Sequence, residues 1–308
     1  MAKFRMNHAR QGSGGIGRIR PLLLIGIIAF LYLGIRMFPS FFNRFLDLDE
    51  EVFNYPDTEV QDYEEEELYF LPASKNANII RHQFYALSYN EEHELAEWVA
   101  YELTRDQLNR NKIRREDNYR PDPKVKSKSA TTYDYRGSGY DRGHLLPVGD
   151  RKFSFEAMNE TFFMSNISPQ ERHFNGGIWR ELEENVRDWA RKYRKVYVVT
   201  GPVLTERRKD RIGKNKVSVP KSFYKVILDI SEPELKGIGF IIPNETSEKP
   251  LYEYAVSIDE VEELTGINFF PDLMEEELER KLESKVNSRL WDFDKRRFET
   301  RVSVWNVR

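Results

Sequence analysis

The chain has 308 residues, of which 40% are hydrophobic and 13% aromatic, so it is long and apolar enough to bury a core. It contains no cysteine, which excludes disulfide scaffolds, thiolate metal sites and cysteine nucleophiles. The net charge of -3 is unevenly distributed, because residues 1–20 are basic without acids and residues 47–67 hold eleven acids without Lys or Arg. Residues 68–308 carry 41 basic and 40 acidic residues, so a surface for a polyanion has to be a local patch.

An uncharged apolar run covers residues 21–35, and further aromatic residues follow Arg36. A membrane span needs about 20 apolar residues, and the long side chain of Arg36 can place its charge at the membrane surface. We therefore expect an N-terminal transmembrane helix, an uncleaved signal anchor, over residues 21–42. A cleaved signal peptide is the main alternative, although no small-x-small site follows the apolar run.

The segments around this run differ in charge. Its basic flank predicts that residues 1–20 form a cytoplasmic tail and that the rest of the chain lies outside the cytoplasm, on the periplasmic or secreted side. Residues 43–67 have the composition of an acidic linker. The remaining residues, 68–308, are expected to form one folded domain.

The first predicted helix of this domain begins at Asn90, a residue type that caps helices, which is followed by two glutamates and continues to Leu103. Residues 105–128 hold nine basic residues against four acids, which indicates an exposed loop. A second basic run covers residues 207–225. Both runs are candidate surfaces for a nucleic-acid backbone, and solvated charge is the alternative for each.

Three segments rich in β-branched residues predict strands, at residues 196–204, 223–230 and 237–242. A 3.6-residue apolar period predicts a helix over residues 178–193. Strands and helices do not alternate regularly, so we expect an α+β fold with a mostly antiparallel sheet flanked by helices.

Two helices are predicted near the C-terminus. Ser257 and Glu260 form a capping box before a short helix that Gly266 ends. Asp272 is the expected N-cap of the last long helix.

The chemistry is expected around His144, which follows Asp141 and Arg142 in the segment YDRGHLLP. A lone histidine is more often structural than catalytic. Asn175 offers a neutral oxygen of the kind that Mg²⁺ accepts, although a loop asparagine is ordinarily a turn or cap residue. Glu183 falls at the centre of the apolar stripe of the predicted helix, between Trp179 and Val186, where a carboxylate needs a partner. An i,i+4 pair with Arg187 is the structural alternative for this glutamate.

These motifs, in this order, resemble the DNA/RNA non-specific endonucleases, the family of endonuclease G and of bacterial nucleases of the ββα-metal (His-Me finger) class. The resemblance runs from about Ile79 to Leu273. It rests on DRGHLLP at 141–147, SNISPQ at 165–170, FNGGIWRELE at 174–183, VYVVTGP at 196–202, VPKSFYKV at 219–226 and VEELTGINFF at 261–270.

The resemblance implies a ββα-metal active-site motif and assigns roles within it. His144 activates water, Asn175 is the direct protein ligand of Mg²⁺, for which Mn²⁺ can substitute, and Glu183 holds metal-bound water. Asn166 orients the histidine region or the phosphate, and Arg142 supports the motif and the substrate charge. An arginine ahead of the motif binds phosphate in the family, and Arg115 is the best match.

The resemblance implies an endonuclease that cuts DNA and RNA without sequence preference, and the predicted anchor over residues 21–42 would hold it in a membrane. Relatives are often homodimers. Neutral imidazole can take a proton from water, and Mg²⁺ can neutralise charge that develops on the phosphate. A zinc hydrolase built on His144 and His173 is an alternative, but a third nitrogen or sulfur ligand is not evident. A membrane-tethered nucleic-acid-binding module without catalysis is the alternative from another class.

Overall fold

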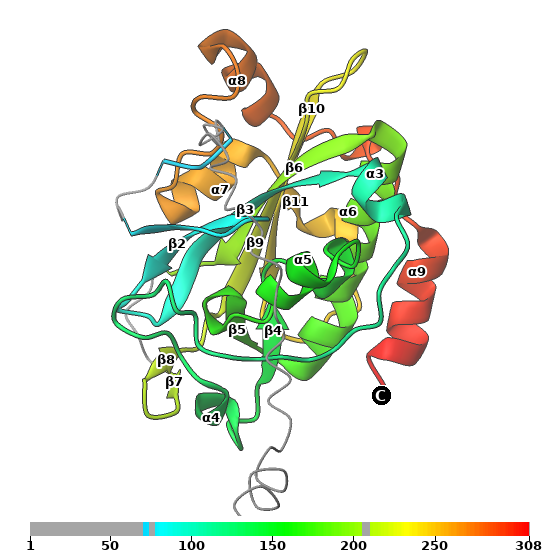
Figure 1. The fold of residues 1–308 in the computed structure, drawn as a ribbon. Helices are drawn as coiled ribbons and strands as arrows, with labels where there is room; N and C mark the ends of the chain where they lie inside the picture. The colour runs from blue at the N-terminus through cyan, green and yellow to red at the C-terminus, as the bar shows by residue number, and fades with distance from the viewer. Residues whose placement is uncertain (1–69, 74–77, 205–209, 308) are drawn as a thin grey trace, which may run out of the picture. The chain divides into compact units, whose positions relative to one another are not determined.

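A seven-stranded sheet is the centre of the computed structural model, which describes residues 70–73, 78–204 and 210–307 (Figure 1). Every pair of neighbouring strands in this sheet is antiparallel, which confirms the α+β class with a mainly antiparallel sheet. In spatial order the strands are β1 (Ile79–Arg81), β2 (Ala86–Asn90), β3 (Leu95–Thr104), β6 (Lys195–Pro202), β9 (Ser222–Asp229), β10 (Lys236–Pro243) and β11 (Ala255–Val256).

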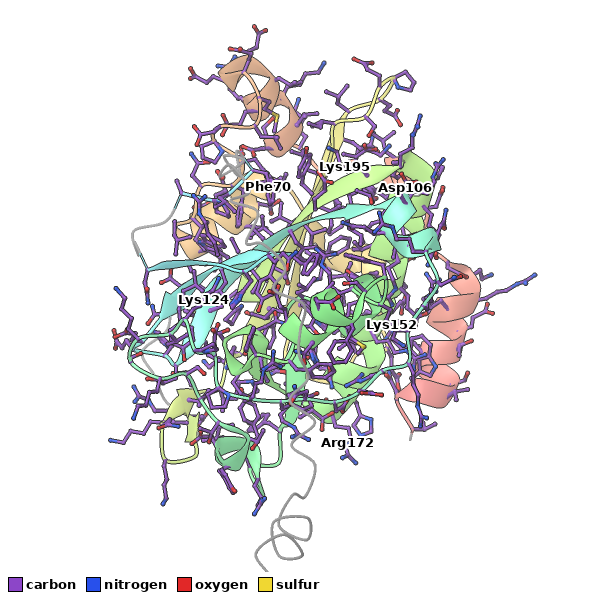
Figure 2. All side chains as sticks on the ribbon, viewed as in Figure 1. Phe70, Asp106, Lys124, Lys152, Arg172 and Lys195 are labelled. Atoms are coloured by element: carbon purple, nitrogen blue, oxygen red, sulfur yellow. The ribbon has the colours of Figure 1, made fainter. Side chains whose placement is uncertain are left out.

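Helices cover both faces of the sheet. One core lies under α6 (Arg180–Tyr193), and the other lies under α7 (Ile258–Thr265) and α8 (Glu276–Glu283), on the opposite side of the sheet (Figure 1). Side chains from successive strand residues alternate between the two cores, as Val198 and Val199 do in β6. Figure 2 shows side chains filling the space on both sides of the strands.

The helix predicted from Asn90 to Leu103 is wrong, because these residues end β2 and form most of β3. Their apolar residues fit a helical period because β3 is buried on both faces. Trp98 packs into one core and Val99 into the other, so the strand lacks the alternation of a half-exposed strand. Hydrogen bonding to β2 and β6 makes this segment a strand, and the local sequence pattern carries no information about that pairing.

The other long elements agree with those predicted from the sequence. The three predicted strands are β6, β9 and β10, and α6 covers most of the helix predicted over residues 178–193. The Ser257 capping box begins α7, and Gly266, with φ 72°, ends it in the left-handed region. Asp272 does not cap the next helix, because Leu273 N donates to Phe270 O at 3.1 Å and closes a turn around it. The helix α8 begins after Glu275 instead.

A second, two-stranded unit lies between β3 and α6 in the sequence. Its strands β4 (Asp141–His144) and β5 (Ile167–Gln170) are antiparallel, and a π-helical turn (Phe174–Trp179) then leads into α6. The basic loop after β3 begins with the short helix α3 (Arg105–Asn109).

The remaining short elements are α4 (Thr132–Tyr135), a 3₁₀ turn (Val148–Asp150), α5 (Phe155–Glu160), a 3₁₀ turn (Met164–Asn166), β7 (Arg211–Ile212), β8 (Val217–Ser218), two 3₁₀ turns (Leu251–Tyr254 and Ser288–Leu290), α9 (Lys295–Thr300) and a second π-helical turn (Arg301–Trp305).

The predicted tail, anchor and linker, residues 1–67, lie outside the described residues. Within the described ranges, none of the helices is both long and apolar enough to cross a membrane.

Candidate active site

One cavity of about 520 Å³ brings together the predicted site residues. Its lining includes His144 and Arg142 from β4, Asn175 from the π-helical turn, Glu183 from α6 and Arg115 from the basic loop. Asn166 does not line the cavity and lies behind it. Five of the six side chains singled out in the sequence therefore share one pocket.

The strand pair β4–β5 presents His144 to this cavity. Gly143 pairs with Ser168, and a Cβ atom at Gly143 would lie 2.0 Å from Oε1 of Gln170. A side chain at this position would require the buried side chain of Gln170 to move, which accounts for a glycine between Arg142 and His144.

The imidazole of His144 lies in an aromatic pocket and is 9% exposed. The rings of Tyr119 and Phe162 have their centroids 5.5 and 5.3 Å from it. Burial lowers the pKa of His144 from 6.5 to about 3, with a further contribution from the positive charges of Arg115 and Arg142 against the opposing charge of Asp117. The ring is therefore uncharged at neutral pH, and its Nε2 has no hydrogen-bond partner among the residues described.

Asn166 is fully buried and holds the chain just beyond the histidine. Its Oδ1 accepts a hydrogen bond from Leu146 N at 2.8 Å, and its Nδ2 donates to Leu146 O at 3.0 Å and to Thr161 O at 2.8 Å. Two of these contacts are with backbone atoms of Leu146, two residues after His144, and the third is with Thr161. Of the two roles that the resemblance allows, they fit orientation of the histidine region.

Asn175 is placed by the π-helical turn, in which its backbone N donates to Glu171 O at 2.8 Å. Such turns are rare and occur often at functional sites. The side-chain Nδ2 of Asn175 donates to Asp141 Oδ2 at 3.1 Å. Because the nitrogen is held in this way, the amide oxygen is the atom that remains to accept a cation or a water molecule.

Glu183 is partly exposed and lines the cavity, so it lies at the edge of the buried stripe of α6 and not at its centre. The alternative i,i+4 pair with Arg187 is not formed, because Arg187 Nη1 contacts Asp150 Oδ1 at 2.9 Å. Burial raises the pKa of Glu183 to about 7, against the lowering effect of Arg187 and Lys225.

Lys225 is a site residue that the sequence analysis missed. It was assigned to a basic surface run, but its side chain is fully buried on the α6 side of β9, between Phe223 and Ile227. Its Nζ lies 4.7 Å from the centroid of the Trp179 ring and has no hydrogen-bond partner within the described ranges. A lysine inside the apolar run FYKVILDI was the available signal.

Several charged groups lie around this lysine. Asp150 accepts a hydrogen bond from Tyr101 at 3.0 Å and pairs with Arg187, and both Asp150 and Glu183 raise the pKa of Lys225, which burial lowers to about 8. Buried charges of opposite sign therefore lie directly behind Glu183.

The cavity is rich in cations. Arg115, Arg142, Lys152, Arg180 and Arg187 line it, against the two carboxylates Glu183 and Glu184. The guanidinium of Arg142 lies over the Tyr119 ring at 4.3 Å, and Arg115 pairs with Asp117 at 2.6 Å. A basic cavity with a neutral imidazole and a carboxamide oxygen is typical of enzymes that act on phosphate esters.

Comparison with known proteins agrees with this class. Residues 68–276 match the DNA/RNA non-specific endonucleases, and the chain belongs to this family. It is 37% identical over 209 residues to the mitochondrial nuclease EXOG of Mus musculus, and 35% identical over 211 residues to the mitochondrial endonuclease G of Homo sapiens. These alignments cover 63% and 64% of the chain, and 57% and 71% of the two relatives. The chain thus spans little more than half the length of the mouse nuclease.

A solved structure, the crystal structure of the EndoG/EndoGI complex, is similar to the chain with a TM-score of 0.61 and 32% sequence identity. The similarity covers 67% of this chain and 90% of that one. The antiparallel sheet with flanking helices is therefore the fold of an EndoG-like protein.

The zinc alternative gains no support from the structure. Among the residues whose placement is described, the groups of three His, Asp or Glu side chains close enough to share an ion include neither His144 nor His173. His173 also does not line the cavity that holds His144.

Proposed function

We propose that the chain is a metal-dependent endonuclease that hydrolyses phosphodiester bonds of DNA and RNA without sequence preference. The observation that carries the proposal is that the uncharged imidazole of His144 and the amide of Asn175 share one cation-rich cavity. Membership of the family supports the same reaction.

His144 acts as the general base. Its low pKa keeps the imidazole neutral, so one of its two ring nitrogens can take a proton from the attacking water. The water oxygen forms a bond to phosphorus while the bond from phosphorus to the 3′ oxygen breaks. Asn166 contributes indirectly, because it fixes the backbone that follows the histidine.

The donor set fits a hard cation such as Mg²⁺, with Mn²⁺ as a substitute. Asn175 would hold it through the amide oxygen that its bond to Asp141 leaves available, and Glu183 would hold it through water. When bound, the ion supplies charge neutralisation at the phosphate and at the leaving oxygen. Lys225 and Arg187 favour the ionised form of Glu183 that this role requires.

The arginines account for substrate binding without sequence preference, because contacts to phosphate carry no direct base information. Arg115 and Arg142 are the proposed phosphate ligands. A neighbouring cavity of about 720 Å³ shares Tyr119, Arg142 and Asn175 with the first, so a strand can continue past the cleavage point. This second cavity adds Arg136, a further cation.

Digestion of plasmid DNA and of RNA tests the reaction, with Mg²⁺ and then with a chelator. His144→Ala should reduce the cleavage rate by about 100- to 10,000-fold and leave nucleic-acid binding largely intact, because only the proton acceptor is removed. His173→Ala is the matched control and should cleave normally, whereas a zinc site would lose activity with either histidine. A wild-type chain that binds both nucleic acids but cuts neither would favour the non-catalytic module.

Residues 21–42 are further proposed to anchor the chain in a membrane, with the catalytic domain outside the cytoplasm. The support is the apolar run and its flanking charges. The mass of the native N-terminus, with alkaline extraction of membranes, tests this, since a cleaved peptide would shorten the chain and release the protein. Light scattering of the purified domain tests whether it forms a homodimer.

A further inference from the structure

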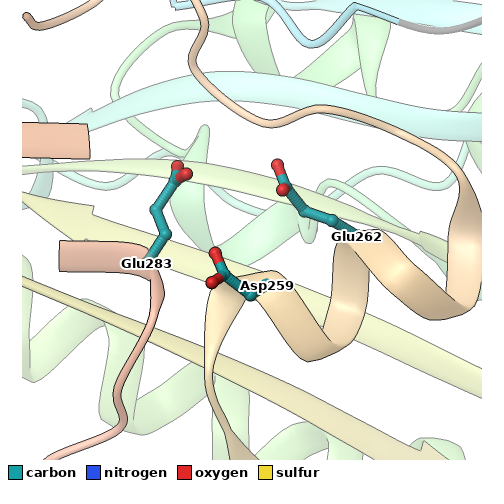
Figure 3. Close-up of side chains that lie close together, drawn as sticks. All are labelled: Asp259, Glu262 and Glu283. Atoms are coloured by element: carbon teal, nitrogen blue, oxygen red, sulfur yellow. The ribbon is translucent and has the colours of Figure 1, made fainter. Parts of the chain in front are cut away.

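Away from the active site, we propose that Asp259, Glu262 and Glu283 form a second cation site, which binds Ca²⁺ and joins α7 to the end of α8. Ligand oxygens of these three side chains all lie within 4.8 Å of one another. Figure 3 shows the three carboxylates pointing toward one another, two from α7 and one from α8.

The buried member of the group is Glu283, which is 3% exposed. Its Oε1 has no hydrogen-bond partner within residues 70–73, 78–204 and 210–307. A buried carboxylate without a partner is costly, because a charged oxygen loses its hydration and gains nothing in return. A cation between the two helices would provide the missing partner.

The neighbouring charges are all negative. Burial, together with the negative charges of Glu262, Glu279 and Asp259, raises the pKa of Glu283 to about 9. None of the ion pairs formed within the described part of the chain includes these four carboxylates. Without a cation, Glu283 therefore keeps its proton at neutral pH, and a divalent ion that displaces this proton would neutralise several carboxylates at once.

The geometry favours calcium over magnesium. Calcium binds six to eight oxygens at about 2.3–2.6 Å in a flexible geometry, so it accepts several carboxylates whose oxygens lie within 4.8 Å of one another. Magnesium needs shorter bonds and usually keeps several waters. Asp259 is exposed, so solvent can complete a calcium shell of six to eight oxygens.

The position of the site defines its role. Ile258 and Val261 of α7 and Leu282 of α8 pack into the core on the sheet face opposite α6, so the site lies across the sheet from the cavity of His144. Calcium here would hold α7 and α8 together on that face. Its effect is expected on stability, separately from the cleavage reaction.

The test is thermal unfolding of the full chain, first freed of metal with EDTA and then titrated with CaCl₂. At free calcium about 100 times its Kd, the Tm of the wild type should rise by about 5–10 °C. Glu283→Gln should abolish this rise, because it removes the buried carboxylate ligand, and should change the Tm in EDTA little, because Glu283 is already uncharged there at neutral pH. Asp259→Asn, at an exposed position, provides the same test if Glu283→Gln does not fold.

Two controls locate the bound calcium. Glu263→Gln, an exposed neighbour on α7, should keep the full rise in Tm, and so should Asn175→Ala, which removes the proposed active-site ligand. The proposal is overturned if calcium leaves the wild-type Tm unchanged. It is also overturned if the rise persists in both Glu283→Gln and Asp259→Asn, which would place the ion elsewhere, for example on the acidic residues 47–67, or if only Asn175→Ala removes it.

Discussion

The side-chain nitrogen of Asn175 donates a hydrogen bond to Asp141 Oδ2 across 3.1 Å, which joins the π-helical turn to the first residue of β4. The bond fixes which end of the amide is free. A ligand oxygen is useful to a metal only if its orientation is held by the residues around it.

Asp141→Ala should therefore weaken metal binding while leaving the Asn175 side chain in place. We expect the Mg²⁺ concentration for half-maximal cleavage to increase by about 10- to 100-fold, as measured by plasmid digestion across a Mg²⁺ series. Arg172→Ala is the matched control, because this exposed side chain contacts the same carboxylate at 3.8 Å without touching Asn175. An unchanged Mg²⁺ requirement in Asp141→Ala would remove this residue from the ligand arrangement.

The low pKa of His144 predicts a pH dependence of stability. Between about pH 3 and pH 6.5 the unfolded chain binds a proton at this residue and the native protein does not. The stabilisation is therefore complete above pH 6.5 and is lost as the pH falls, by roughly 1.4 kcal/mol for each pH unit.

Urea unfolding at pH 7 and pH 5 measures this effect. The wild type should lose about 2 kcal/mol more than His144→Asn over this interval, because the variant lacks the titrating ring. Equal losses in the two proteins would mean that the ring is protonated in the folded state at pH 5.

Asn166→Ala is expected to act through the fold. It removes three hydrogen bonds and leaves the N–H and C=O of Leu146 without their partner, at a cost of about 3 kcal/mol in the free energy of unfolding. Asn166→Asp keeps an acceptor for Leu146 N and should fall between the wild type and the alanine variant in urea unfolding. If Asn166→Ala lost cleavage at full stability, a direct role at the phosphate would replace the positioning role.

Arg115 should contribute to the salt dependence of binding. Arg115→Ala removes a cation from the cavity and should reduce the slope of log Kd against log salt by about one, for DNA and RNA of any sequence. Arg114→Ala removes an exposed charge that does not line the cavity, so it should change the slope less. Equal effects of the two variants would indicate general electrostatic attraction without a phosphate site at Arg115.

The candidate site was largely predictable because its parts are close in sequence. His144, Asn175 and Glu183 come from β4, a π-helical turn and α6, which follow one another along the chain within a single local unit. The order and spacing of motifs therefore predict well which residues of such a unit lie together. The resemblance also indicated Arg115, although its contacts with Asp117 and Phe162 could only come from the structure.

Residues that long-range pairing brings to the site were not predictable in the same way. Lys225 lies behind Glu183 because β9 pairs with β6 and turns its alternate side chains toward α6. The same pairing converts the apparent helix after Asn90 into strand β3. The hydrophobic period of one segment does not show which other strand it pairs with.

The buried position of Lys225 has a consequence for engineering. A methionine there would pack among Phe223, Ile227 and Trp179 without the cost of a desolvated ammonium group, so screens for heat resistance should favour it. The same replacement would remove the positive charge behind Glu183. Heat-resistant variants selected without a cleavage assay would therefore accumulate changes that silence the enzyme.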